Sequence, residues 1–250
     1  MAVKIKEFYQ NGEYLQKNPD WHVEASPWKA QTVLRMIRRN GLEPRSVCEI
    51  GCGAGEILKI LQQELDPACT FDGYEIAPQA YALAKQRENE RLHVHLADFL
   101  QERNVHFDLI LIIDVLEHFE NCFSVLRDIK DKSSYKIFLL PLDVSVFSVL
   151  HNELIDYRHA TGHLHFFTKD VILEVIQDAG YEVLDTFYAQ PPLDPTPWQA
   201  VKGNPRRIAR KGIRLLKRGL QRLPGRLLYP LHQDLAVRIF GGWRLLVLAR

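Results

Sequence analysis

Residues 47–58 read Val-Cys-Glu-Ile-Gly-Cys-Gly-Ala-Gly-Glu-Ile-Leu, and this stretch decides the fold that we expect. Its apolar start predicts a short buried strand, and the residues from Glu56 onward predict a helix. Between them, Gly51, Gly53 and Gly55 leave so little side-chain bulk that a ligand can lie against the backbone. A tight turn without a ligand is the alternative, but glycine costs backbone entropy wherever nothing requires it. The stretch therefore predicts a strand–turn–helix unit that binds a ligand.

Strands and helices alternate outward from this unit. A first helix is expected to begin with Ser26 as its N-cap and Pro27 as its first helical residue. The expected strands are 46–50, 70–75, 92–96, 107–113, 136–140, 181–188 and 243–249, and the expected later helices are 56–64, 78–88, 122–130 and 168–180. This alternation predicts an α/β protein with a doubly wound sheet, in which ligands bind at the carboxyl ends of the strands.

Two acids lie at the carboxyl ends of predicted strands, at that edge of the sheet. Glu49 stands two residues before the first glycine, so the turn suits a ligand with positive charge as well as a nucleotide-like body. Glu75 ends the next strand, at about the distance from Gly51 that separates the glycines and the ribose-binding acid of a nucleotide site. An acid at that place can accept hydrogen bonds from both ribose hydroxyls. We therefore expect Glu75 to bind a ribose, although an exposed acid at a strand end is a common alternative.

The pattern Glu49-x-Gly51-x-Gly53-x-Gly55 after a hydrophobic strand resembles motif I of the class I S-adenosylmethionine-dependent methyltransferases. Asp114-Val115-Leu116-Glu117-His118 is similar to the motif IV region of the type 11/12/23 branch, which includes the ubiquinone-type O-methyltransferases. The resemblance covers residues 42–190 and the last strand. It implies a Rossmann-like, seven-stranded, mostly parallel sheet whose last strand is antiparallel, and S-adenosylmethionine as the cofactor.

The resemblance also implies roles for individual residues, which we state as expectations. The cofactor-binding residues would be Glu49, Gly51, Cys52, Gly53, Gly55, Glu75, Ile76, Asp98, Phe99, Asp114 and Val115. Glu49 would face the ammonium group, Ile76 would pack on the adenine, and Asp98 would accept from the adenine amino group beside the Phe99 backbone amide. Asp is also a frequent turn residue, so a purely structural role for Asp98 stays open.

Histidines provide the candidates for catalysis. His118 and His163 could each accept a proton from a substrate hydroxyl, and a structural role is an equal alternative for each. His163 and His165 form a His-x-His pair that resembles a metal-ligand pair, but no cysteine or acid pattern accompanies it, so we expect no metal site. Methyl transfer mainly requires alignment of the reacting groups, and an enzyme without a base remains consistent with the sequence.

Positive charge is concentrated near the end of the chain. Residues 190–240 hold 11 Lys/Arg and 2 Asp/Glu, whereas the other residues hold 21 and 29. A Pro-rich linker there leads into residues 202–226, which at helical spacing have an apolar arc opposite a basic arc. Three interpretations follow: packing on the core or on a second subunit, contact with an anionic membrane, and, ranked last because aromatic residues are not interleaved, nucleic-acid binding.

Length and composition predict one globular α/β domain with elaborations. We expect an N-terminal helical cap at 1–41 and a methyltransferase domain at 42–250, with the basic insertion within 190–240. We expect a cytoplasmic protein, with peripheral membrane contact left open, because the four cysteines have no regular spacing and the sequence has no signal-peptide pattern and no apolar run of about 20 residues.

The expected reaction is methyl transfer to a small-molecule or glycan hydroxyl, with amine acceptors as a variant. A non-catalytic scaffold that binds the cofactor and an NAD-dependent oxidoreductase are the alternatives, and the second is disfavoured because Gly-x-Gly-x-x-Gly is absent.

Overall fold

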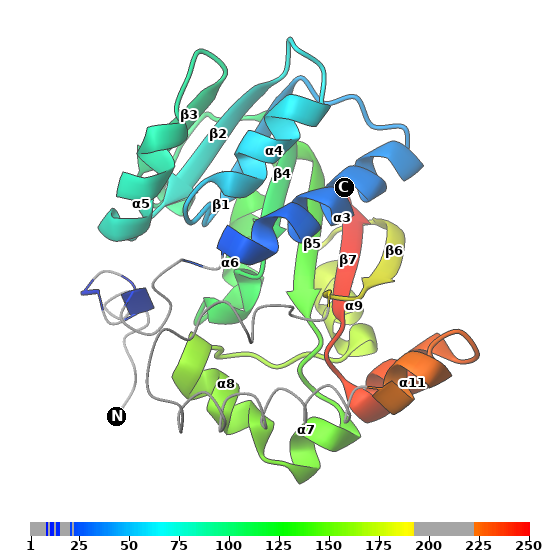
Figure 1. Cartoon of the computed structure of the whole chain (residues 1–250). Coiled ribbons are helices and arrows are strands. Elements are labelled where there is room, and N and C mark those ends of the chain that lie inside the picture. Colours follow the sequence, from blue (N-terminus) through cyan, green and yellow to red (C-terminus); the bar gives the residue numbers. More distant parts are fainter. Residues whose placement is uncertain (1–8, 10, 13, 16–20, 22, 193–222) are drawn as a thin grey trace.

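The computed structural model describes residues 9, 11–12, 14–15, 21, 23–192 and 223–250. Within them lies one seven-stranded sheet in the order β3-β2-β1-β4-β5-β7-β6 (Figure 1). The strands are β1 (Ser46–Ile50), β2 (Thr70–Glu75), β3 (Leu92–Leu96), β4 (Phe107–Ile113), β5 (Ser133–Pro141), β6 (Val183–Ala189) and β7 (Arg244–Ala249). The α-helices are α3 (Ser26–Arg39), α4 (Glu56–Glu64), α5 (Pro78–Ala84), α6 (Cys122–Lys130), α7 (Val146–Leu150), α8 (Glu153–Thr161), α9 (Lys169–Asp178) and α11 (Gln233–Phe240). Short 3₁₀ turns are η1 (Val23–Ala25), η2 (Lys85–Arg87), η3 (Phe99–Gln101) and η4 (Leu116–His118).

Strand direction follows the expectation. The pairs β1–β2, β1–β4, β2–β3 and β4–β5 are parallel, whereas β7 runs antiparallel to both β5 and β6. The parallel strands β1 and β4 lie in the middle of the sheet and are covered on both faces, which explains why the sequence of β4 is apolar almost throughout. The predicted α/β architecture with an antiparallel last strand is confirmed.

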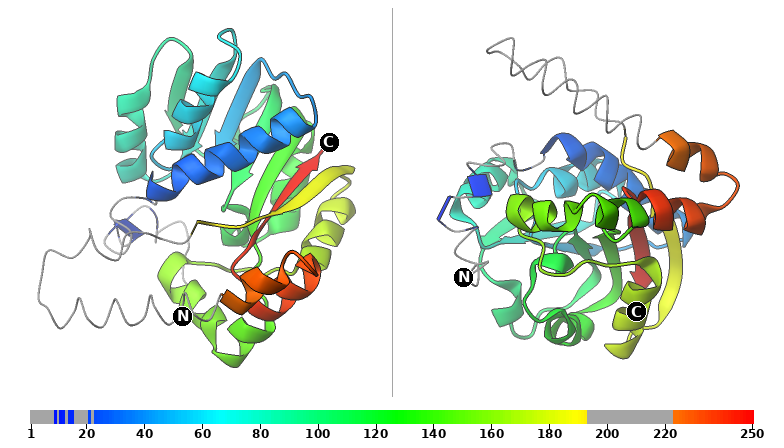
Figure 2. Two further views of the ribbon diagram at one scale, coloured as in Figure 1. Left: turned by 45° about the vertical axis from the view of Figure 1, so that its right-hand side comes forward. Right: turned by 90° about the horizontal axis from the view of Figure 1, so that it is seen from below.

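The sheet separates two hydrophobic clusters. In β4, Leu109 and Leu111 pack with α3 and α4 on one face, while Ile110 and Ile112 pack with α6 and α9 on the other. Seen from below, α3 and α9 lie on opposite sides of the sheet (Figure 2, right). This alternation follows from the two-residue period of a strand, so every second side chain of β4 enters the same cluster.

The glycine at the middle of β2 permits a close approach between layers. A Cβ at Gly73 would lie 2.8 Å from Cys52 Sγ and 3.0 Å from Leu58 Cδ1. The Cys52 side chain is therefore packed against the sheet, and its thiol belongs to the same cluster as α4. This contact holds the turn after β1 close to β2.

Several predicted boundaries differ from the structure. Ser26 does not cap the first helix: the N-cap is Ala25, and Ser26 is a buried first residue of α3. The expected helix 78–88 ends as an α-helix at Ala84 and continues as η2. Strand β5 begins at Ser133, before the expected first residue Lys136. Lys136 is buried inside the strand, and its amine donates to the carbonyls of Ser133 and Lys130.

Helices α7, α8 and α11 cover the carboxyl ends of the parallel strands. These helices lie together beneath the end of β5 (Figure 1). None of the helices in the described part of the chain is both long and apolar enough to cross a membrane. Residues 202–222 of the predicted basic helix lie outside the described residues, and the division of the chain at residue 41 stays a prediction.

Candidate functional site

A cavity of about 960 Å³ opens at the carboxyl ends of the central strands. One end is lined by the turn after β1 and by the ends of β2, β3 and β4; the other is lined by α7, α8 and aromatic residues near the N-terminus. The lining includes Gly51, Gly53, Glu75, Ile76, Asp98, Phe99, Asp114, Val115, His118 and His163, and also Tyr9, Tyr14, Trp21, Lys29, Asp143, Tyr157 and Arg244. The cavity is near the upper end of the ~300–1,000 Å³ range of small-molecule sites.

The turn after β1 requires glycine for two different reasons. Gly51, Gly53 and Gly55 all have positive φ angles, of 70°, 55° and 75°, which side chains rarely adopt. A Cβ at Gly51 would also lie 2.8 Å from Val115 Cγ2. At Gly53 a Cβ would meet no protein atom within 4 Å, although Gly53 lines the cavity. Among the described residues, none therefore fills the space at Gly53, and the cavity reaches the backbone of the turn there.

Glu75 joins the end of β2 to this turn. Its Oε2 accepts from the Gly53 amide at 2.9 Å, and its Oε1 accepts from the Ile76 and Ala77 amides at 2.8 Å each. Burial raises the pKa of Glu75, and the three amide donors oppose that shift. Glu75 lines the cavity while it orders the turn, so its carboxylate has a fixed position at the wall.

Asp114 ends β4 in a left-handed conformation and carries two ion pairs. Lys29 Nζ lies 2.9 Å from its Oδ2, and Arg244 Nε lies 2.8 Å from its Oδ1. Burial alone would raise the pKa of Asp114, but Arg244 and Lys29 hold it well below its usual range. The three residues come from β4, α3 and β7, so this ion-pair group joins three distant parts of the chain at the cavity wall.

Asp98 and Phe99, which are predicted to bind the cofactor, also line the cavity. Asp98 accepts from the Leu100 amide at 3.1 Å and thereby caps η3. Phe99 is almost completely buried, and the centres of the Phe99 and Tyr74 rings lie 4.9 Å apart in an edge-to-face arrangement. Both residues line the cavity together with Ile76 and Val115.

Three of the predicted residues do not line the cavity. The Cys52 side chain points into the core, and Gly55 is the N-cap of α4, where an added Cβ would lie 3.2 Å from Ala84 Cβ. Glu49 is buried behind the lining residues Ile50 and Gly51, and its Oε2 has no hydrogen-bond partner among the described residues. Burial raises the pKa of Glu49 to about 8, although Lys29 opposes the shift. Because Glu49 does not line the cavity, it can affect a ligand there through the electrostatic effect of its carboxylate.

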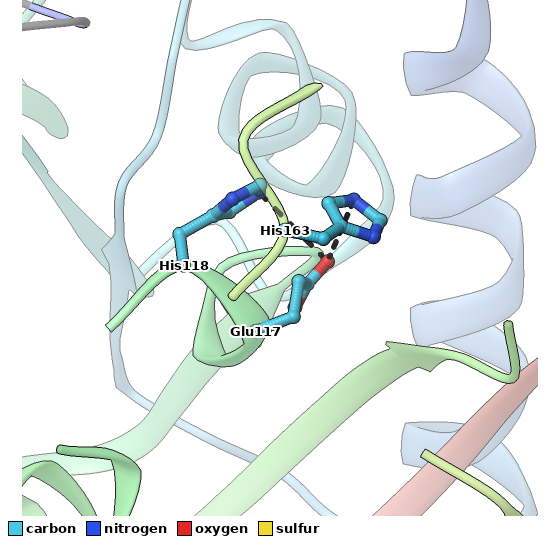
Figure 3. A group of neighbouring side chains, drawn as sticks. All are labelled: Glu117, His118 and His163. Carbon is cyan, nitrogen blue, oxygen red and sulfur yellow. Dashed lines mark ion pairs between the residues drawn. The ribbon is translucent and has the colours of Figure 1, made fainter. Parts of the chain in front are cut away.

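At the other end of the cavity, two histidines meet a buried acid (Figure 3). Nε2 of His118 and Nε2 of His163 each lie 3.9 Å from Oε1 of Glu117. His163 Nδ1 lies 2.6 Å from Oδ2 of Asp143, and His118 Nδ1 lies 3.2 Å from the Gly162 carbonyl. Burial, and next the neighbouring His163, lower the pKa of His118 to about 4, so its ring is neutral at pH 7.

Glu117 itself is fully buried, and neither of its carboxylate oxygens has a hydrogen-bond partner within the described part of the chain. Burial, and next the charge of Asp114, raise the pKa of Glu117 well above its ordinary value. Its backbone carbonyl accepts from the Leu164 and His165 amides, so η4 and the loop 162–165 are joined independently of the side chains.

Sequence reasoning missed Lys29, Asp143 and Arg244. Their contacts join residues far apart in the chain, for which no local pattern exists. Arg244 gave the best available signal, because it is a charged residue at the start of an otherwise apolar strand.

Comparison with known proteins places these observations in a family. The profile of the family described as "Methyltransferase domain" matches residues 22–186. No curated protein sequence matches the chain.

Solved structures with this fold come from several organisms. A structure of a proposed sarcosine dimethylglycine methyltransferase from Galdieria sulphuraria has a TM-score of 0.65 and 14% identity, over 99% of this chain and 98% of that one. Magnesium protoporphyrin IX methyltransferase from Synechocystis PCC 6803, with bound SAH, has a TM-score of 0.59 and 16% identity, over 76% and 93%. A SAM-dependent methyltransferase from Archaeoglobus fulgidus has a TM-score of 0.54 and 18% identity, over 88% and 93%.

Proposed function

This chain belongs to the family of S-adenosylmethionine-dependent methyltransferases, and we propose that it methylates a hydroxyl oxygen of a small-molecule or glycan acceptor. One observation carries the proposal: a single cavity holds the open glycine turn at one end and two histidines at the other. Its volume has room for a nucleoside cofactor and a second small molecule, and its acceptor end is lined by aromatic rings. These features support an acceptor that enters the cavity whole.

The residues present fit the cofactor. The space above Gly53 has no protein atom where a side chain would be, and the Glu49 Oε2 lacks a partner although it is buried. S-adenosylmethionine supplies an electrophilic methyl group on a positively charged sulfur, together with an ammonium group. We propose that the turn from Gly51 to Gly53 lies against the methionine part, with Glu49 as its buried counter-charge, and that Glu75 and Asp98 hold the ribose and the adenine.

The two histidines support a hydroxyl acceptor over an amine. Both line the cavity, and the Nδ1 atom of each is occupied by an acceptor group, so Nε2 is left to receive a proton. An amine needs less help, because it is already nucleophilic. Candidate acceptors should therefore be offered in matched pairs that differ only in carrying a hydroxyl or an amine.

The test is a screen of such pairs with detection of S-adenosylhomocysteine and of the methylated product. We expect turnover with at least one hydroxyl acceptor and none with its amine counterpart. Methylation of amines alone would contradict the proposed acceptor class, while leaving methyl transfer itself intact. Contact with an anionic membrane or a second subunit through residues 202–226 stays a separate prediction.

The raised pKa of Glu49 leads to a second expected result. The pKa of Glu49 in the folded protein is about 8, which is above its ordinary value. Protonated Glu49 therefore stabilises the free protein at pH values below its ordinary pKa, and this contribution is lost as the pH rises through about 8. A cationic ligand favours the carboxylate, so we expect cofactor binding to release up to about 0.9 proton at pH 7 and to tighten as pH rises toward 8.

Calorimetric titration with S-adenosylmethionine, in two buffers with different ionisation enthalpies, measures this proton release. Glu49→Gln keeps the size of the side chain but removes the titrating group, so the release should fall close to zero. Equal release by the variant and the unaltered chain would show that Glu49 does not respond to the ligand.

A further inference from the structure

We propose that Glu117, His118 and His163 bind one divalent metal ion of the borderline class, such as Zn²⁺, at the acceptor end of the cavity. Their ligand atoms all lie within 4.8 Å of one another (Figure 3). Metal binding itself is independent of the reaction, whereas the role that we give the ion rests on the proposed hydroxyl acceptor.

The distances suit an ion better than direct contacts. Each histidine Nε2 lies 3.9 Å from Glu117 Oε1, which exceeds the ~3.2 Å limit of a good hydrogen bond. Zinc bonds of about 2.0–2.1 Å in a tetrahedron separate neighbouring ligand atoms by roughly 3.3 Å. Contraction by about 0.3 Å on each side would bring each nitrogen–oxygen pair to that spacing. All three ligand atoms lie within 4.8 Å of one another, and rotation of the two imidazole rings toward the ion would close the remaining gap between the nitrogens.

The tautomers of both histidines can be deduced from their partners. The Gly162 carbonyl only accepts, so His118 Nδ1 carries the hydrogen and Nε2 presents a lone pair. Asp143 holds His163 in the same way through Nδ1. A carboxylate or carbonyl on the second nitrogen is the usual partner of a metal-binding histidine, because it orients the ring and increases its basicity.

Three acceptor groups therefore converge on one point, and none of the described residues places a donor between them. Glu117 has both oxygens buried and unpartnered within the described residues, and the two Nε2 lone pairs face it. A proton on Glu117 would satisfy at most one acceptor, and at 3.9 Å it reaches neither nitrogen well. One cation satisfies all three.

The chain also builds the group before any ion is present. Amides of Leu164 and His165 donate to the Glu117 carbonyl at 2.8 and 3.2 Å, which fixes η4 against the loop that carries His163. His118 and His163 line the cavity, so a fourth coordination position faces the acceptor. With an ion bound, the two Nε2 atoms are metal ligands and no longer accept a proton, so the ion replaces them in activating the acceptor. It would bind the acceptor hydroxyl and lower its pKa; the O–H bond then breaks, its proton passes to solvent, and the oxygen keeps the electron pair.

The experiment is a Zn²⁺ titration of the full chain, freed of any affinity tag and stripped of metal with a chelator. Calorimetry without cofactor or acceptor should show one site per chain. Glu117→Gln and His163→Gln should each weaken binding at least ~100-fold, since each removes one of three ligands. His151→Gln is the matched control, because His151 is exposed and lies outside the group, and it should leave the affinity unchanged.

Binding of S-adenosylmethionine by each stripped variant shows whether it has folded. Absence of a Zn²⁺ site, or a site that survives both substitutions, would overturn the metal proposal while leaving the proposed function standing. If a variant fails to fold, the visible bands of Co²⁺ bound to the unaltered chain decide: a tetrahedral nitrogen–oxygen spectrum supports the site, and a thiolate spectrum overturns it.

Discussion

Gly53→Val should abolish S-adenosylmethionine binding, with a loss of at least ~100-fold in affinity, or about 2.7 kcal/mol. Gly53 has a φ of 55° and lines the cavity, and its Cβ would meet no protein atom within 4 Å. The new side chain would therefore occupy the space that we assign to the methionine part of the cofactor. Calorimetric titration of the variant measures the effect directly.

Gly41→Val is the matched control for backbone strain. Gly41 has a φ of 60°, its Cβ would also meet nothing within 4 Å, and it follows α3, away from the cavity. Both variants should lose roughly 1–2 kcal/mol of unfolding free energy, because valine is strained in the left-handed region. Only Gly53→Val should lose cofactor binding. Normal binding by Gly53→Val would mean that the cofactor lies elsewhere.

Asp114→Asn should have the largest effect on stability. The substitution keeps the shape of the side chain and tolerates the positive φ, but it leaves Lys29 and Arg244 without their counter-charge. Removing one partner from a fully buried group of charges costs about 3–5 kcal/mol. The three side chains here are 15–28% exposed, so the expected loss lies at the lower end of that range. We therefore expect the unfolding free energy in urea to fall by about 3 kcal/mol and Tm to fall by roughly 6–12 °C.

Asp170→Asn tests whether burial of the ion pairs is the reason for the large loss of stability expected for Asp114→Asn. Asp170 pairs with Arg238 at 2.6 Å, but both side chains are about 60% exposed. Exposed pairs of this kind contribute about 1 kcal/mol or less. A loss for Asp114→Asn no greater than that for Asp170→Asn would contradict the view that the ion-pair group joins β4, α3 and β7.

The sequence predicts the central unit well because its signals are local. Strand β1, the glycine turn and α4 follow from consecutive residues, and the bounds of β1, α4, β2, β3 and β4 agree with the expected ranges. Lys136 illustrates the limit. A lysine within a strand normally indicates exposure, yet carbonyls brought close by the turn before β5 accept its buried amine.

The sequence predicts one end of the cavity better than the other, again because local signals determine only one of them. Its cofactor end is formed by residues that each follow a strand, so the doubly wound topology is enough to predict that they meet. Its acceptor end depends on pairs such as Asp143 with His163 and Glu117 with His163, which only the path of the loops after β4 and β5 brings together. The metal site that we propose would take its ligands from two separate loops, and the spacing of residues along the chain does not indicate such a group.

Calorimetric titration of the full chain with S-adenosylmethionine, and separately with NAD, tests the central claim most directly. The account predicts one site per chain for S-adenosylmethionine, removed by Gly53→Val and retained by Gly41→Val, and no heat of binding with NAD. Failure to bind S-adenosylmethionine, or binding of NAD at the same site, would contradict it.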